Sequence, residues 1–209
     1  MAAVTHVPGA RLTVGGLPAF NADYIDAINA RVVGLVLLVV LATLIGLIVG
    51  FRSLLVPVKA LVLNPLSVAS AYGAVVLVLQ EGQGGALLGL NEPLGAVFHA
   101  VPVLVFCAVF GLSMDYEVFL VARVAEARRT MGEDDAIVVG LARTGGVITS
   151  AAAIMITVFA AFTLGECVFI KVLGFALATA VFVDATLVHM AIGPALLTLA
   201  GKWNWWPGR

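Results

Sequence analysis

Charged residues are scarce in this chain. Only 11% of its 209 residues are Asp, Glu, Lys or Arg, while 62% are hydrophobic. A soluble domain carries roughly 25% charged residues, so this chain has too few polar groups to cover a surface that faces water. The mean hydropathy of +1.14 points the same way. We therefore expect an integral membrane protein that is surrounded by membrane lipids.

Several other features are missing, and each absence excludes a class of function. The two cysteines, Cys107 and Cys167, lie too far apart for a disulfide framework or a metal site. A net charge of −1 gives no basic balance that would suggest nucleic acid. No Gly-Lys-Ser/Thr triplet of a phosphate-binding loop occurs, and no nucleophile–base pair or metal cluster is present. We expect no enzyme activity and no cofactor, so that any transport would draw its energy from a gradient.

Long uncharged segments dominate the chain instead. They contain twenty to thirty residues each, and the last is interrupted only by Asp184. A membrane-spanning helix needs about 20 apolar residues, whereas the strands of a membrane barrel are ~10 residues long and alternate in polarity. Pro194 is expected to kink the last segment or to mark its inner end. The sequence predicts an all-α bundle of five transmembrane helices, at about residues 32–51, 58–80, 97–121, 145–165 and 171–200.

Lysine and arginine are distributed unevenly over the two sides that five spans define. The side with the loop after the first span, loop 122–145 and the C-terminus carries eight basic residues, against three on the other side. Because positive charge favours the cytoplasmic side, the tail 202–209 is predicted to be cytoplasmic and the N-terminus external. Residues 1–30 lack the pattern of a signal peptide. Loop 122–145 is expected to contain a solvated connecting helix, and the three tail tryptophans are expected to be interfacial anchors.

Three carboxylates fall inside the predicted spans: Asp115, Glu117 and Asp184. A charged side chain at a helix centre costs about 2.5–3.5 kcal/mol, so such residues usually face the bundle interior and often relay protons. Asp115 precedes Arg123 by eight residues, or roughly 12 Å of helix rise, which places it in the inner half of the bilayer. Glu117 points ~200° away from Asp115 around the helix and is expected to extend toward the membrane surface.

Burial favours the neutral form of a carboxylic acid, so Asp115 could take up a proton from one side and release it to the other. The adjacent Tyr116 could hold this carboxylate or pass it a proton. Asp184 defines a second polar site, because Thr186 and His189 follow closely enough to hydrogen-bond to it or share a proton. For Asp184 a role in proton binding and a role in helix packing both remain open.

The segments GLSMDYEVFLVARVAEARRT, GLARTGGVITSAA and VDATLV occur in an order and spacing that resemble the MMPL family. This family contains exporters of lipids and other hydrophobic compounds, belongs to the resistance–nodulation–division superfamily and is related to sterol-sensing-domain proteins. The similarity covers about residues 15–206. It implies the last five spans of the second of two halves, with residues 1–31 as the remnant of an extracytoplasmic porter domain and its lead-in. Within them, residues 14–31 resemble the end of that domain.

The resemblance also implies a function and a site. It implies proton-driven export of a lipid or hydrophobic substrate across the bacterial inner membrane, with Asp115 as the proton carrier and Tyr116 as its hydrogen-bond partner. A matching pair would come from a missing N-terminal half or partner subunit. His189 departs from the family pattern, since many relatives carry arginine there. The alternative is a membrane module that does not transport but senses lipids or binds partners, as sterol-sensing domains do.

Overall fold

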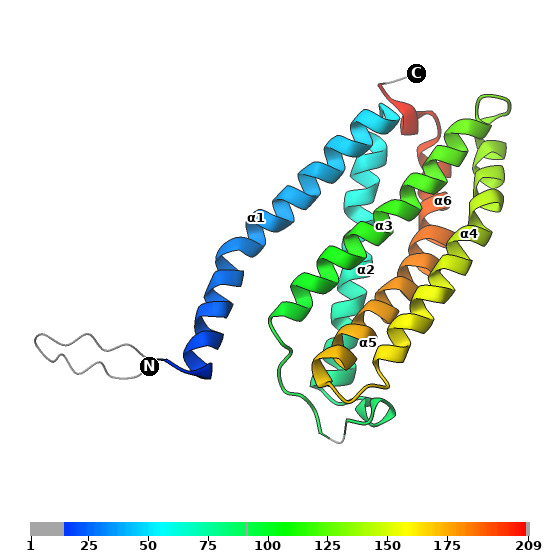
Figure 1. The fold of residues 1–209 in the computed structure, drawn as a ribbon. Coiled ribbons are helices and arrows are strands. Elements are labelled where there is room, and N and C mark those ends of the chain that lie inside the picture. The colour runs from blue at the N-terminus through cyan, green and yellow to red at the C-terminus, as the bar shows by residue number, and fades with distance from the viewer. Residues whose placement is uncertain (1–14, 91, 208–209) are drawn as a thin grey trace, which may run out of the picture.

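The computed structural model describes residues 15–90 and 92–207, and it confirms the prediction of five membrane-spanning helices. Each predicted span overlaps one helical segment that is long and apolar enough to cross a membrane (Figure 1). These segments are Ala19–Phe51, Leu55–Gln80, Ala100–Ala127, Glu133–Phe162 and Val168–Trp205.

Two of the five spans are built from more than one kind of helix. The second span ends in a π-helix, and the fifth contains a longer π-helix between two α-helices. In chain order the elements are α1 (Leu17–Phe51), α2 (Leu55–Val75), the π-helix η1 (Val76–Gln80), the 3-10 helix η2 (Gly85–Leu88), α3 (Ala100–Ala127), α4 (Glu133–Phe162), α5 (Val168–Val183), the π-helix η3 (Asp184–Ile192), α6 (Gly193–Ala200) and the 3-10 helix η4 (Gly201–Trp205).

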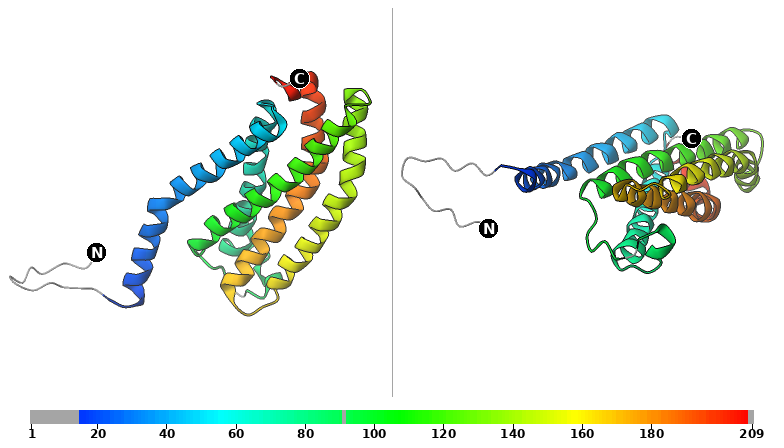
Figure 2. Two further views of the ribbon diagram at one scale, coloured as in Figure 1. Left: turned by 45° about the horizontal axis from the view of Figure 1, so that its top comes forward. Right: turned by 60° about the horizontal axis from the view of Figure 1, so that its bottom comes forward.

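Four spans form the bundle, and α1 lies at its side. Helices α2, α3, α4 and α5 pack against one another, while α1 contacts α2 and α3 (Figures 1 and 2). Of the side chains described in α1, Leu47 alone is buried. The core is therefore formed by the other four spans, and α1 presents an apolar surface to its surroundings.

One prediction about the connecting segments was wrong. Loop 122–145 holds no separate helix, because α3 continues to Ala127 and α4 already begins at Glu133. Three acids occupy the first turn of α4, where the helix dipole favours negative charge. Residues 17–31 form the first turns of α1, and their assignment to the end of a porter domain stays a prediction. Residues 1–14 lie outside the described residues.

The turns that carry most of the basic residues lie together. The α1–α2 turn, the α3–α4 turn and the C-terminal segment are all at one end of the bundle, at the top of Figure 1, as the count of five spans predicted. Only part of the tail is exposed there. Trp203 and Trp206 are exposed, as anchors would be. Trp205 is instead buried: its Nε1 donates a hydrogen bond to Glu133 at 2.9 Å, and the Arg128 guanidinium lies 4.9 Å from its ring centroid.

A single buried asparagine ties the C-terminal segment to the bundle. Asn204 is 1% exposed, and its Nδ2 donates to the backbone oxygens of Leu197 and Gly201 at 2.7 and 2.8 Å. Its Oδ1 accepts a hydrogen bond from Lys59, and its backbone oxygen accepts one from the Ser53 hydroxyl. Asn204 thereby fixes the end of the last span against the beginning of α2.

We expect Asn204→Ala to lower the free energy of unfolding by about 2–3 kcal/mol, because it leaves several buried polar groups without partners. Thermal unfolding in a mild detergent, followed by circular dichroism, measures the change. The control is Thr198→Ala, which removes an exposed hydroxyl that bonds only the Pro194 carbonyl. Equal melting temperatures for the two variants would contradict the role assigned to Asn204.

Candidate functional site

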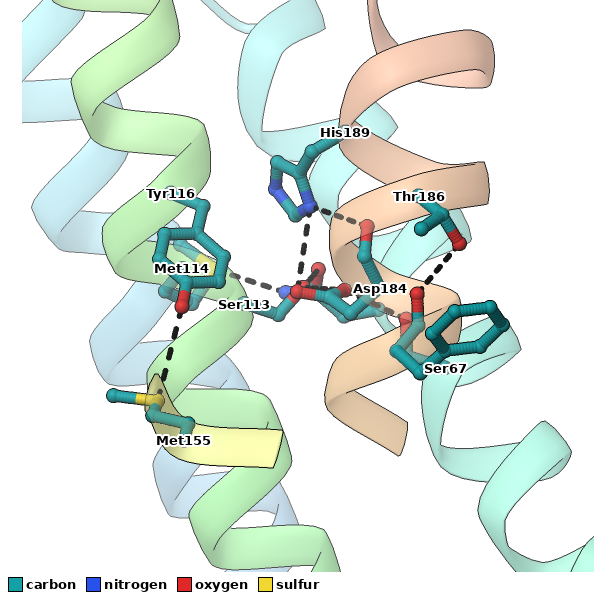
Figure 3. Close-up of polar contacts among 10 residues, drawn as sticks. Ser67, Ser113, Met114, Tyr116, Met155, Asp184, Thr186 and His189 are labelled. Carbon is teal, nitrogen blue, oxygen red and sulfur yellow. Dashed lines mark hydrogen bonds and ion pairs between the residues drawn. The ribbon is translucent and has the colours of Figure 1, made fainter. Parts of the chain in front are cut away.

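The most deeply buried carboxylate of the described bundle is Asp184, at the first residue of η3. It is 1% exposed and lies where α2, α3 and the last span meet (Figure 3). Its Oδ1 is 2.7 Å from the hydroxyl of Ser67 on α2 and 2.6 Å from the hydroxyl of Ser113 on α3. Both serines are fully buried. The three spans are thus joined by a polar cluster inside an otherwise apolar core.

The number of available protons links this cluster to the protonation state of Asp184. The Ser113 hydroxyl has one proton but two acceptors, Asp184 Oδ1 at 2.6 Å and Asn64 Oδ1 at 2.8 Å. A neutral Asp184 can donate to Ser113, which then donates to Asn64. An ionised Asp184 accepts the hydrogen bond of the Ser113 hydroxyl, so the Asn64 amide must turn its NH2 group toward Ser113. Uptake of a proton by Asp184 would therefore reorient hydrogen bonds between α2 and α3.

The second oxygen of Asp184 faces His189. Oδ2 lies 3.3 Å from His189 Nδ1 and has no other partner among the described residues. The same Nδ1 is 3.0 Å from the Asp184 backbone oxygen, which can only accept a hydrogen bond. Nδ1 therefore carries the proton when Asp184 is ionised. The imidazole also packs edge-on against Tyr116, with ring centroids 5.6 Å apart.

The π-helix explains why His189 reaches Asp184. In an α-helix a residue five positions further on lies about 140° away around the axis, whereas π-helical winding bonds residue i to residue i+5 and places the two on one face. Residues 184–192 adopt this winding directly before Pro194. Proline lacks an N–H for the carbonyl four residues earlier, so Pro194 interrupts the α-helical hydrogen-bond pattern next to these wider turns. Such π segments are frequent at functional sites.

The structure separates the other predicted site residues. Asp115 is exposed on the side of α3. Tyr116 is buried, but its hydroxyl lies 3.7 Å from the sulfur of Met155 and is not bonded to Asp115. Thr186 is exposed and donates to the Phe182 backbone oxygen at 2.6 Å, so it does not join Asp184. Of the second predicted site, Asp184 and His189 are brought together.

Glu117 does not extend to the membrane surface as predicted. It is 8% exposed and lines an internal cavity together with Lys59 and His189. Asp115 and Glu117 thus occupy opposite faces of α3, and Glu117 is the one that faces the bundle.

Sequence reasoning missed both hydroxyl partners of Asp184, Ser67 and Ser113, and also Asn64, which bonds Ser113. A signal for them exists in the sequence. Asn64 and Ser67 are three positions apart, and Ser113 and Glu117 are four apart, so each pair lies on one helix face. Polar side chains on one face of a membrane helix commonly bond a neighbouring helix.

These features define a multi-pass membrane bundle with a hydrogen-bonded carboxylate buried between its helices, an arrangement typical of membrane transport proteins. The sequence model of the MMPL family matches residues 1–209, and the chain belongs to this family.

Curated relatives include mycobacterial transport proteins. The chain is 37% identical over 209 residues to the trehalose monomycolate exporter MmpL3 of Mycobacterium tuberculosis. This match covers 99% of the chain and 22% of the relative. It is 38% identical over 199 residues to the heme uptake protein MmpL11 of the same organism, and equally to the mycolic acid-containing lipids exporter MmpL11 of Mycolicibacterium smegmatis. Each of these two matches covers 94% of this chain and 20% of the relative. The chain thus spans about a fifth of the length of these relatives.

Proposed function

We propose that this chain is part of a proton-driven exporter of lipids or other hydrophobic compounds, in which Asp184 binds the proton. The observation that carries this proposal is the burial of Asp184 among groups that can accommodate both its neutral and its ionised form. A carboxylate that served packing alone would need only one arrangement of protons. Two relatives named as lipid exporters, MmpL3 and MmpL11, support a lipid as substrate.

The same proposal gives Asp115 and Tyr116 a role on α3, away from the Asp184 cluster. Asp115 lies on an exposed side of α3 whose other members include Leu104, Val118 and Phe119. A carboxylate that faces lipid is costly, which favours a protein partner on this face. We propose that the missing part of the transporter covers it and that Asp115 exchanges protons there, while Tyr116 packs between this face and His189.

The proposed setting is the inner membrane of a bacterium, with the C-terminus in the cytoplasm. Its support is the collection of basic residues at the end of the bundle that holds the C-terminus. The alternative, a module that senses lipids without transporting them, would also place α1 and α3 against a partner. The buried proton-binding cluster favours transport, because a sensor of neutral lipid needs no such group.

A chimera tests the proposal. This chain is 36% identical over 203 residues to MmpL3 of M. smegmatis. In the chimera it replaces the matching part of that protein, in cells that depend on MmpL3. Export of trehalose monomycolate to the cell surface is measured with and without an uncoupler of the proton gradient. We expect export that stops with the uncoupler and falls by about tenfold or more in an Asp115→Asn variant.

The matched control is Asp135→Asn, which neutralises an exposed acid in the first turn of α4. This variant should export normally. Export that continues after the gradient has been collapsed would overturn the proton-driven mechanism. A chimera that is correctly inserted but exports nothing would favour the lipid-sensing alternative.

A further inference from the structure

A small internal cavity lies between Asp184 and the end of the bundle that holds the C-terminus. Its volume of about 20 Å³ is enough for one water molecule, which needs roughly 10–15 Å³ of such space and two to four polar partners. Three charged or titratable side chains line it, each from a different span: Lys59 from α2, Glu117 from α3 and His189 from η3. The remaining wall is formed by Gly193 and by the apolar residues Val56, Leu63, Leu120, Val121, Val188 and Leu197.

Glu117 is the unexplained member of this group. It is more than nine-tenths buried and has no hydrogen bond to another described protein group, although a buried carboxylate without a partner is strongly unfavourable. Glu117 follows Ser113 by one helix turn on the same face of α3, on the side toward the C-terminal end. Its carboxylate therefore lies between the Asp184 cluster and Lys59, and it faces the space that a water would occupy.

Among the described residues, a buried polar path leads from the Asp184 cluster past the cavity toward one end of the bundle, and no such path leads toward the other end. The Lys59 ammonium donates to the Leu196 backbone oxygen at 2.8 Å and to Asn204, which reaches the C-terminal end of the bundle. In the opposite direction the buried residues form an apolar cluster that includes Val68, Val105 and Val172. The low-energy route for a proton between Asp184 and water therefore leads past Glu117.

We propose that Glu117 is a second proton-binding carboxylate, which exchanges its proton with Asp184 through one cavity water and His189. This inference rests on the proposed function of Asp184. It adds that Asp184 exchanges protons with the water at the end of the bundle that holds the C-terminus. In each transfer one carboxyl group loses the proton that the other gains. The water and the imidazole each receive one proton as they give another. Lys59 stabilises Glu117 when it is ionised.

The test measures how fast Asp184 takes up a proton. The 209-residue chain is placed in nanodiscs of phosphatidylcholine and phosphatidylglycerol, the pH is lowered rapidly, and the carboxyl infrared band that Asp184→Asn removes is followed in time. We expect Glu117→Gln to slow the appearance of this band by about tenfold or more, while the final titration curve of Asp184 stays in place. Glu126→Gln, which neutralises an exposed acid in the last turn of α3, should leave the rate unchanged.

A second variant tests the water without changing an acid. Val121→Leu adds one methylene group to the cavity wall and displaces the water. The carboxyl band of Asp184 should therefore appear more slowly, as it does in Glu117→Gln. Wild-type rates in Glu117→Gln would overturn this inference and leave the proposed function intact, provided that Asp184 still titrates. A wild-type chain without any titrating band at Asp184 would overturn the proposed function as well.

Discussion

An Asp184→Asn variant is expected to keep its helical fold and to lose the proton that the wild-type bundle takes up. The asparagine oxygen can still accept from Ser67 and Ser113, and its NH2 group can donate to His189 once the imidazole proton moves to Nε2. The free energy of unfolding should therefore change by about 1 kcal/mol or less. The amide cannot bind or release a proton, so the two hydrogen-bonding arrangements around Ser113 are reduced to one.

Two measurements separate these effects. Infrared difference spectra against pH should show a carboxyl band in the wild-type chain that is missing in Asp184→Asn, and the variant chimera with MmpL3 should lose export by about tenfold or more. Thermal unfolding should be close to wild type. Asp135→Asn serves as the control of the same chemistry at an exposed site. Normal export by the Asp184→Asn chimera would show that Asp184 only joins the helices.

Gly174→Ala is expected to cause the largest loss of stability among single-methyl changes in α5. A Cβ atom at this position would lie 2.6 Å from the Phe159 backbone oxygen and 2.6 Å from the Phe162 Cβ, both on α4. The backbone oxygen belongs to a helix and cannot move alone, so α4 and α5 would have to separate. Small residues allow such close helix contacts in membranes, and overpacking a tight site costs about 1–3 kcal/mol.

Gly146→Ala provides a control with the opposite sign. Gly146 lies within α4, and a Cβ atom there would meet nothing within 4 Å. Because glycine destabilises a helix interior by roughly 0.5–1 kcal/mol relative to alanine, this variant should be as stable as wild type or slightly more stable. Unfolding in detergent with increasing denaturant measures the stability of both variants. A Gly174→Ala variant with wild-type stability would show that α4 and α5 do not pack as closely as the structure indicates.

The sequence by itself determined the number of spans and which turns share an end of the bundle. Hydrocarbon excludes charge over about 20 residues, so the uncharged segments show directly in the sequence. The order of the DYE, ARTG and VDATLV segments was also sufficient to indicate the MMPL family. Asp184 and His189 were predicted as a polar pair because the few titratable residues inside a span stand out.

Only the tertiary structure decided which acids face inward. Asp115 and Glu117 lie on opposite sides of α3, and the sequence gives their relative angle but not the rotation of the helix. Packing of Ser113 against α2 and the last span fixes that rotation, which buries Glu117 and exposes Asp115. The pairing of Asp184 with His189 depended in turn on the π-helix before Pro194. These outcomes rest on contacts between residues far apart in the sequence, such as Asn64 with Ser113, 49 positions apart, and Ser67 with Asp184, 117 positions apart, and no local pattern encodes them.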